Sequence, residues 1–111
     1  MAKKKSDKDR QRLRALIEEA TVDCYEEGEE FQGMVNMLEE NVVCPFPAKI
    51  VGELVAVTDL EAPPHGFGIQ AVCRYKNKDY RIDVTSLEWT KQRPEGFEWI
   101  EAYLAWLETV G

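Results

Sequence analysis

A chain of 111 residues has enough material for one hydrophobic core and too little for two, and its 44% hydrophobic and 32% charged residues are typical of a globular protein. The formal net charge of −7 makes nucleic acid an unfavourable partner, because binding to phosphates depends on Lys and Arg. The chain has no run of about 18 apolar residues and no secretory signal, so we expect a cytoplasmic protein with no membrane partner.

The charges are distributed unevenly along the chain. Residues 1–14 carry seven basic and two acidic groups, whereas residues 15–48 carry nine acidic groups and no basic one. We expect residues 1–8 to form a disordered basic tail, because charged termini are commonly disordered. The acidic stretch that follows lacks any countercharge of its own, and it is the most informative feature of the sequence.

Residues 9–42 are predicted to form an acidic helical segment. From Leu13 to Leu38 the apolar residues recur every three or four positions, which is the spacing of one helical stripe. Gly28 and Gly33 interrupt this pattern, and a glycine costs about 1 kcal/mol relative to alanine inside a helix. We therefore expect the segment to bend or break at one of these two glycines.

Residues 45–89 are predicted to form a small antiparallel sheet. Two prolines end the preceding helix, and β-branched or alternating residues then indicate short strands with tight turns between them. Such a pattern favours a curled sheet or barrel of four to five strands with an SH3-like outline. A surface loop is expected over residues 59–66. The four expected strands are residues 48–51, 54–57, 67–75 and 79–84.

A last helix is predicted over residues 94–109, because Pro94 is well tolerated in a first turn. We expect its wide apolar face to pack as core, and the alternative is a contact with a protein partner or with a second copy in a homodimer. The whole chain is then a single α+β domain. The apolar face consists of two rows, one of Phe97, Ile100, Leu104 and Leu107 and one of Trp99, Tyr103 and Trp106.

The residue types of common catalytic sites are scarce. Cys24, Cys44 and Cys73 include no C-x-x-C pair, so we interpret them as small buried hydrophobes rather than as disulfide or zinc ligands. His65 is the only histidine, and its Pro-Pro-His-Gly context predicts an exposed loop. Phosphate-loop and hydrolase motifs are absent from the sequence. We therefore expect that the protein is not an enzyme.

Carboxylates of the acidic segment are candidate metal ligands. On a continuous helix, Glu19, Asp23, Glu26 and Glu30 lie within one sector, and Glu27 lies at its edge. Their repulsion costs about 0.2–0.5 kcal/mol per pair, which a bound cation would relieve. Hard oxygen ligands without histidine or thiolate favour Ca²⁺, with Mg²⁺ as its competitor.

The calcium site is not of the EF-hand type. A loop that begins at Asp23 would place Gly28 correctly at position six, but it would place Tyr25 at position three. Met34 would occupy position twelve, where the bidentate glutamate belongs. The loop pattern therefore fails at two of its ligand positions.

Three motifs follow one another along the chain, Val22-Asp23-x-Tyr25-Glu26-Glu27, Leu38-Glu39-Glu40 and Pro45-Phe46-x-Ala48. In this order, with the aromatic helix after them, they resemble the cyanobacterial calcium-binding protein family (CcbP-like), which binds Ca²⁺ without EF-hands. The likeness spans roughly residues 20–107 and is strongest over 22–48. The chain departs from the family pattern at residues 34–37, where the family tends to have aromatic residues, and at Gly28, where it tends to have an acidic one.

The resemblance implies a calcium-buffering or calcium-sensing function. On a straight helix Asp23 and Glu40 stand about 25 Å apart, so either there are two sites or the chain folds back at one of the two glycines. Asp59 and Glu61 are further acidic residues that the sequence cannot position. The alternative function is a metal-free module that docks a basic protein partner on its acidic helix. The implied ligands are Asp23, Glu26, Glu27, Glu39 and Glu40, together with Glu29, and Glu30 joins them from helix geometry alone.

Overall fold

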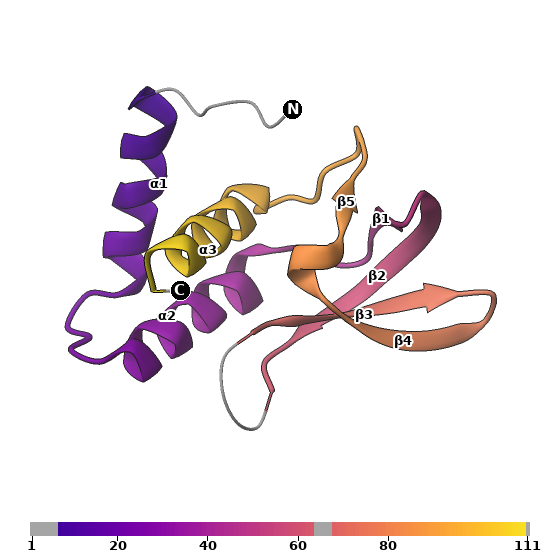
Figure 1. Cartoon of the computed structure of the whole chain (residues 1–111), viewed down its shortest axis with the longest axis horizontal. Helices are drawn as coiled ribbons and strands as arrows, with labels where there is room; N and C mark the ends of the chain where they lie inside the picture. The colour runs from indigo at the N-terminus through magenta and orange to yellow at the C-terminus, as the bar shows by residue number, and fades with distance from the viewer. Residues whose placement is uncertain (1–6, 64–67, 111) are drawn as a thin grey trace.

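The computed structural model describes residues 7–63 and 68–110. Within these ranges it has three α-helices and a five-stranded antiparallel sheet, which confirms the α+β class (Figure 1). The elements in chain order are α1 (Asp7–Ala20), α2 (Glu27–Asn41), β1 (Phe46–Ile50), β2 (Glu53–Glu61), β3 (Gln70–Tyr75), β4 (Lys78–Asp83), a 3-10 turn (Val84–Ser86), β5 (Glu88–Trp89) and α3 (Phe97–Val110).

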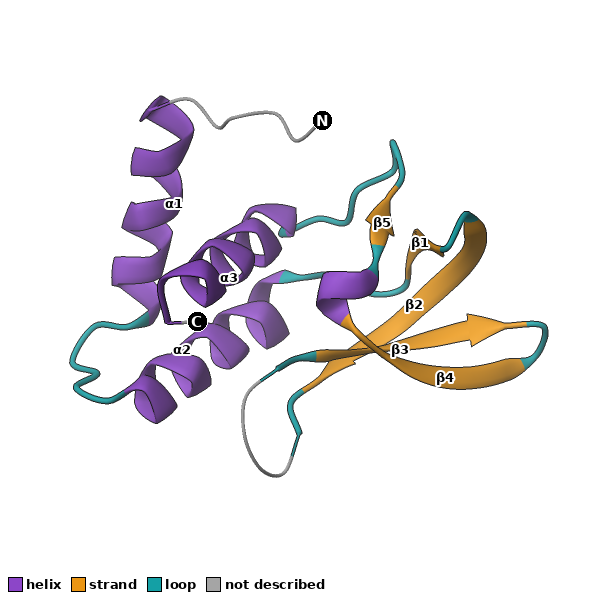
Figure 2. Ribbon diagram, in the orientation of Figure 1, coloured by secondary structure: helices purple, strands orange, loops and turns teal. Residues whose placement is uncertain are grey.

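The helices gather at one end of the molecule and the strands extend toward the other (Figure 2). Helix α1 already begins at Asp7, so residues 7 and 8 of the expected tail are helical. The rest of that tail and the predicted loop position of His65 lie outside the described residues. None of the described helices is both long and apolar enough to span a membrane.

The N-terminal helical segment breaks at residues 21–26, so the prediction of a break at Gly28 or Gly33 is wrong. Asp23 takes a left-handed φ of 61°, which a helix cannot continue through. Gly33 instead lies in the middle of α2 against the backbone carbonyl of Ala20, where an added Cβ would overlap the oxygen. This glycine therefore permits the close approach of two helices.

The sheet has the strand order β4-β3-β2-β1-β5, and every neighbouring pair is antiparallel. Strands β4 and β5 form its two edges and are not paired with each other in the described chain, so the sheet is open rather than a closed barrel. The fifth strand, β5, is only two residues long. The sequence pattern did not reveal it.

Strand β2 is longer than expected and includes residues 59–61, which were predicted to belong to a loop. The pairing of β2 with β3 shifts between Val57 and Asp59, which is the register change of a β-bulge. Beyond the bulge Leu60 pairs with Ala71 and is buried. The bulge breaks the simple alternation of inward and outward side chains, and this explains why the pattern suggested that the strand ended early. Strand β3 begins at Gln70 rather than at residue 67.

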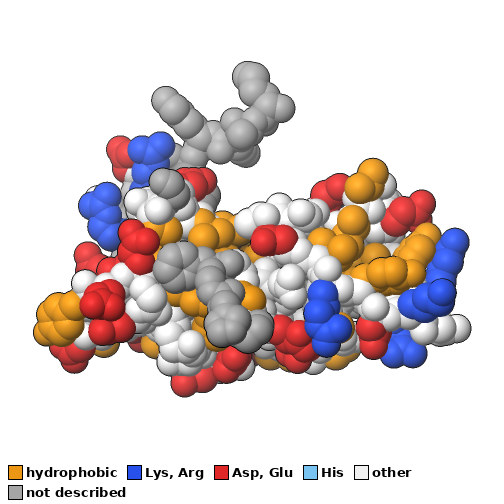
Figure 3. All heavy atoms as spheres, turned by 60° about the horizontal axis from the view of Figure 1, so that its bottom comes forward, with side chains coloured by type: hydrophobic (Ala, Val, Ile, Leu, Met, Phe, Trp, Pro, Cys, Tyr) orange, Lys and Arg blue, Asp and Glu red, His pale blue; other side chains and the backbone are white. Residues whose placement is uncertain are grey.

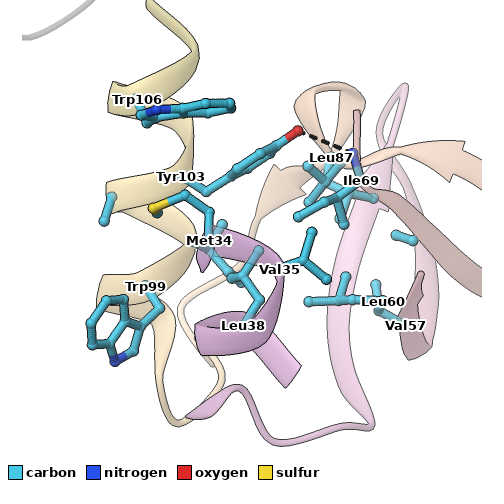
Figure 4. Packing of buried hydrophobic residues seen from close by; sticks show 14 of the residues in the cluster. Met34, Val35, Leu38, Val57, Leu60, Ile69, Leu87, Trp99, Tyr103 and Trp106 are labelled. Atoms are coloured by element: carbon cyan, nitrogen blue, oxygen red, sulfur yellow. Dashed lines mark hydrogen bonds between the residues drawn. The ribbon is translucent and has the colours of Figure 1, made fainter. Parts of the chain in front are cut away.

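One hydrophobic cluster joins α2, α3 and the inner face of the sheet (Figure 4). On α3, Trp99, Tyr103 and Trp106 are buried, so the expected packing of this helix as core is confirmed. The Tyr103 hydroxyl accepts a hydrogen bond from the backbone N–H of Ile69 at 3.0 Å, and burial raises the pKa of that hydroxyl. Contact with a partner through α3 stays a prediction. The partly exposed apolar residues of this helix are Phe97, Leu104, Ala105, Leu107 and Val110.

Helix α3 begins at Phe97 rather than at Pro94. Gly96 has a φ of 84°, and the backbone carbonyl of Asn41 lies against its Cα. This left-handed residue separates the proline from the helix, and its lack of a side chain lets the end of α2 lie close by. The N–H of Val43 donates to the Glu95 carbonyl at 3.0 Å at the same crossing.

The two glycines of α2 should respond in opposite ways to alanine. Gly33→Ala forces a Cβ against the Ala20 carbonyl, so it should destabilise the protein by about 1–3 kcal/mol. Gly28→Ala meets no atom within 4 Å and should stabilise it by about 0.5–1 kcal/mol. Urea unfolding of both variants measures the difference, and equal effects would contradict this account of the helix crossing.

Candidate functional site

The expected acidic face does not lie on one continuous helix. Glu19 belongs to α1, Asp23 to the loop between the helices and Glu26 to the N-cap position of α2. The structure still brings several carboxylates to one region, because the loop leads directly into a first turn with the sequence Glu-Gly-Glu-Glu. We call this region the loop cluster, and it comprises Asp23, Glu26, Glu27, Glu29 and Glu30.

Two members of the loop cluster have structural partners. The Glu29 carboxylate accepts the backbone N–H of Tyr25 at 3.2 Å, and the Glu30 carboxylate accepts the indole N–H of Trp106 at 2.9 Å. Carboxylates in the first turn also interact favourably with the positive end of the helix dipole. Part of the negative charge therefore stabilises the start of α2 and its packing on α3.

The side chains of Asp23, Glu26 and Glu27 are exposed and form no ion pair or hydrogen bond with residues that the structure describes. The N-cap Glu26 in particular makes no side-chain capping bond. Burial raises the pKa of the nearby Cys24 thiol, and the negative field of Glu29, Glu30 and Asp23 raises it further. The loop cluster is thus a region of negative potential with three side chains available to a ligand.

A second acidic group lies at the other end of α2. Glu39 and Glu40 are in its last turn, which contains no basic residue, and there the helix dipole is negative. Glu39 lines a hollow of about 150 Å³ together with Asp59 and Cys44. Burial raises the pKa of Cys44, and Asp59 raises it further. We call Glu39, Glu40 and Asp59 the C-terminal cluster.

Asp59 reaches the C-terminal cluster from β2, next to the bulge. No sequence signal identified this contact, because Asp59 lies about twenty residues beyond Glu39 and was assigned to a loop. Glu61, the other acidic residue of that predicted loop, instead accepts a bond from the Arg81 Nε at 2.9 Å. Only one of the two acids that the sequence could not position therefore lines this hollow.

The two acidic clusters do not meet. Helix α2 is continuous from Glu27 to Asn41, so its ends are separated by about 20 Å at 1.5 Å per residue. The alternative in which the chain folds back at a glycine is wrong. Among residues 7–63 and 68–110, no three His, Cys, Asp or Glu side chains are grouped so that they could hold a metal ion.

Two exposed apolar side chains of the α1–α2 loop lie next to the loop cluster in the sequence. Val22 is 68% exposed and Tyr25 is 87% exposed, which places them among the most exposed large hydrophobic residues of the described chain. Neither residue belongs to the apolar helical stripe of the sequence, and this could have indicated that their side chains are exposed. The region therefore combines negative charge with apolar area.

Comparison of the chain with protein-family models, with curated proteins and with solved structures finds no match. The chemical properties of the two clusters are therefore the basis for a functional assignment.

The bond between Glu30 and Trp106 connects the loop cluster to the core, and its removal should be measurable. Glu30→Ala removes the acceptor of a charge-assisted bond and should destabilise the protein by about 1.5–3 kcal/mol. Glu30→Gln retains an acceptor oxygen and should cost less. Chemical unfolding measures the loss of stability in both variants and in Glu18→Ala, an exposed control on α1. If Glu18→Ala loses as much stability as Glu30→Ala, the stabilising role of the Glu30–Trp106 bond is contradicted.

Proposed function

We propose that this protein binds calcium ions through the carboxylates at the two ends of α2, and that it buffers or senses Ca²⁺. The proposal agrees with the resemblance to the CcbP-like family, which would also make the open sheet a relative of SH3-like folds. The observation that carries it is the presence of two separate acidic clusters at the two ends of α2. The sequence region that contains this helix, residues 15–48, has no Lys or Arg.

The donor atoms are of the type that Ca²⁺ prefers. Carboxylate oxygens are hard ligands, and Ca²⁺ accepts six to eight of them with flexible geometry and with waters in the remaining positions. At the loop cluster the available side chains are Asp23, Glu26 and Glu27. Because these side chains are not already grouped, binding must draw them together, and the ordering of rotatable side chains lowers the affinity.

At the C-terminal cluster, electrostatic repulsion favours a bound cation. Glu39 and Glu40 add negative charge to the end of a helix that is already negative, and each such charge is unfavourable by about 0.3–1 kcal/mol. Asp59 lines the same hollow as Glu39, so a third carboxylate contributes to the repulsion. A cation bound here would convert this repulsion into attraction.

Calcium should stabilise the fold. A ligand that binds only the folded state adds about 2.7 kcal/mol at a hundredfold excess over its Kd. The melting temperature should therefore rise between chelator and millimolar Ca²⁺, and a calorimetric titration should show binding. Asp23→Asn with Glu27→Gln, or Glu39→Gln with Glu40→Gln, should each reduce the stabilisation by calcium. The second pair should also raise the stability of the calcium-free protein, because it removes charges that the helix dipole disfavours.

Glu18→Gln with Glu19→Gln on α1 removes the same amount of charge outside both clusters, and this control should respond to calcium like the wild type. An unchanged melting temperature together with a flat titration of the wild type would overturn the proposal. A control that loses as much binding as the cluster variants would show that only overall charge matters. The same titrations with Mg²⁺ measure the selectivity between the two ions.

Two cysteines allow each cluster to be followed separately. Cys24 lies in the field of the loop cluster and Cys44 beside Asp59, and the carboxylates contribute to the raised pKa of both thiols. Calcium should remove that contribution, lower the two pKa values and increase the thiolate fraction at constant pH. Alkylation measured by mass spectrometry should therefore accelerate at both residues, whereas buried Cys73 should not respond. Acceleration at one residue alone would indicate a single site.

The exposure of Val22 and Tyr25 favours a second candidate function, the metal-free docking of a basic protein partner on the loop cluster. An apolar contact surrounded by complementary charge is a common arrangement at interfaces. Docking of this kind persists in chelator and weakens as salt rises, whereas a calcium-dependent function requires the ion.

A further inference from the structure

The outer face of the sheet carries a hollow of about 590 Å³ at the end away from the helices. Pro47, Ala56 and Arg74 form one row across β1, β2 and β3, on the face opposite to the buried Val57 and Cys73. Leu54 adds apolar area and is 60% exposed. The described helices pack on the other face, so nothing in the described chain covers this row.

The lining of this hollow combines apolar side chains with positive charge. Arg74 and Lys76 line it and no carboxylate does. The Lys76 ammonium lies 5.2 Å from the centre of the Tyr75 ring. Arg74 pairs with Asp79 at 3.5 Å, but both side chains are half exposed and such pairs contribute little. The hollow therefore suits a segment with apolar side chains flanked by carboxylates.

The chain itself has a segment of this kind. Between α1 and α2 the sequence Val22-Asp23-Cys24-Tyr25-Glu26-Glu27 exposes two large apolar side chains, and three carboxylates without partners flank them. Figure 3 shows hydrophobic atoms among acidic ones at the end that carries the α1–α2 loop, and hydrophobic atoms beside both basic and acidic ones at the opposite end, over the strands. The two surfaces are complementary in both charge and polarity.

The loop cannot enter the hollow of its own chain. The α1–α2 loop and the β3–β4 turn lie at opposite ends of the long axis, and the molecule measures 42 Å along it (Figure 1). The loop joins two packed helices, and the hollow lies on paired strands, so neither surface can move to the other end of its own chain. A contact between them therefore requires two molecules.

We propose that the protein associates with itself head to tail, with the α1–α2 loop of one copy in the outer-face hollow of the next. Tyr25 and Val22 contact Leu54 and Pro47, and the carboxylates of the loop lie near Arg74 and Lys76. The contact uses two different surfaces, so each dimer leaves one loop and one hollow free, and longer chains form as concentration rises. The contact uses Asp23, Glu26 and Glu27, which we also propose as calcium ligands, so it is tested in chelator, where it does not depend on the ion.

Sedimentation velocity in chelator at low salt, from about 10 µM to about 1 mM protein, tests this proposal. The average sedimentation coefficient of the wild type should rise with concentration and fall as salt is added. Tyr25→Ser removes the inserted side chain, and Leu54→Asp places a negative charge in the hollow, so each variant should stay monomeric. Tyr80→Ser alters another exposed tyrosine, on the inner face of the sheet, and should associate like the wild type.

The decisive sample is a mixture of the two defective variants. Tyr25→Ser retains an intact hollow and Leu54→Asp retains an intact loop, so together they should form a dimer and no larger species. A wild type that stays monomeric at about 1 mM overturns the proposal. Association that survives either substitution, or a mixture that stays monomeric, also overturns it. Circular dichroism of each variant verifies that it is folded, and none of these outcomes depends on the calcium titrations.

Discussion

The packing of one face of α2 is the interaction on which the rest of the structure depends. Phe31, Met34, Val35 and Leu38 are buried in the same cluster as α3 and the sheet, and in Figure 4 Val35 points toward sheet-side residues such as Leu60. This continuous buried face keeps α2 straight from end to end. As a result the acidic residues at its two ends are held apart, and all of them except the half-buried Glu30 are exposed to solvent.

The two ends of α2 are electrostatically different. At the start, the carboxylates of Glu29 and Glu30 have hydrogen-bond partners and a favourable helix dipole, so part of the acidity has a structural role. At the end, Glu39 and Glu40 have an unfavourable dipole and Asp59 nearby. A cation therefore relieves more repulsion at the C-terminal cluster, whereas the loop cluster has more side chains available. The same loop carries exposed apolar residues, so the proposed calcium binding and the proposed self-association use neighbouring surfaces.

Local patterns predicted the elements well where burial follows a simple period. The apolar stripe located both N-terminal helices, and the two rows of α3 identified Trp99, Tyr103 and Trp106 as core. The predicted position of the break between α1 and α2 was wrong. The sequence does not distinguish a glycine that allows two helices to pack closely from one that interrupts a helix. Gly33 shows this ambiguity directly, since only the position of Ala20 reveals its role.

The candidate site was only partly predictable. Its acidic residues lie mostly in one stretch of the sequence, but their arrangement in space depends on contacts between segments that are distant in the sequence. Residues 15–48 revealed the acidic character of the site from the sequence alone. The contribution of Asp59 depends on a β-bulge and on the approach of β2 to the end of α2, and neither has a sequence signature. The separation of the two clusters likewise followed only from the continuity of α2.

Calcium binding at the two ends of α2 can be measured by NMR, from the amide chemical shifts of the isotope-labelled protein as calcium is added in place of chelator. If both clusters bind the ion, the shift changes should be concentrated in two groups, one over residues 23–30 and one over residues 39–44 with Asp59, while the outer face of β3 and β4 stays unchanged. A spectrum that does not respond to calcium, or shifts confined to surfaces outside both ends of α2, would contradict the proposed binding.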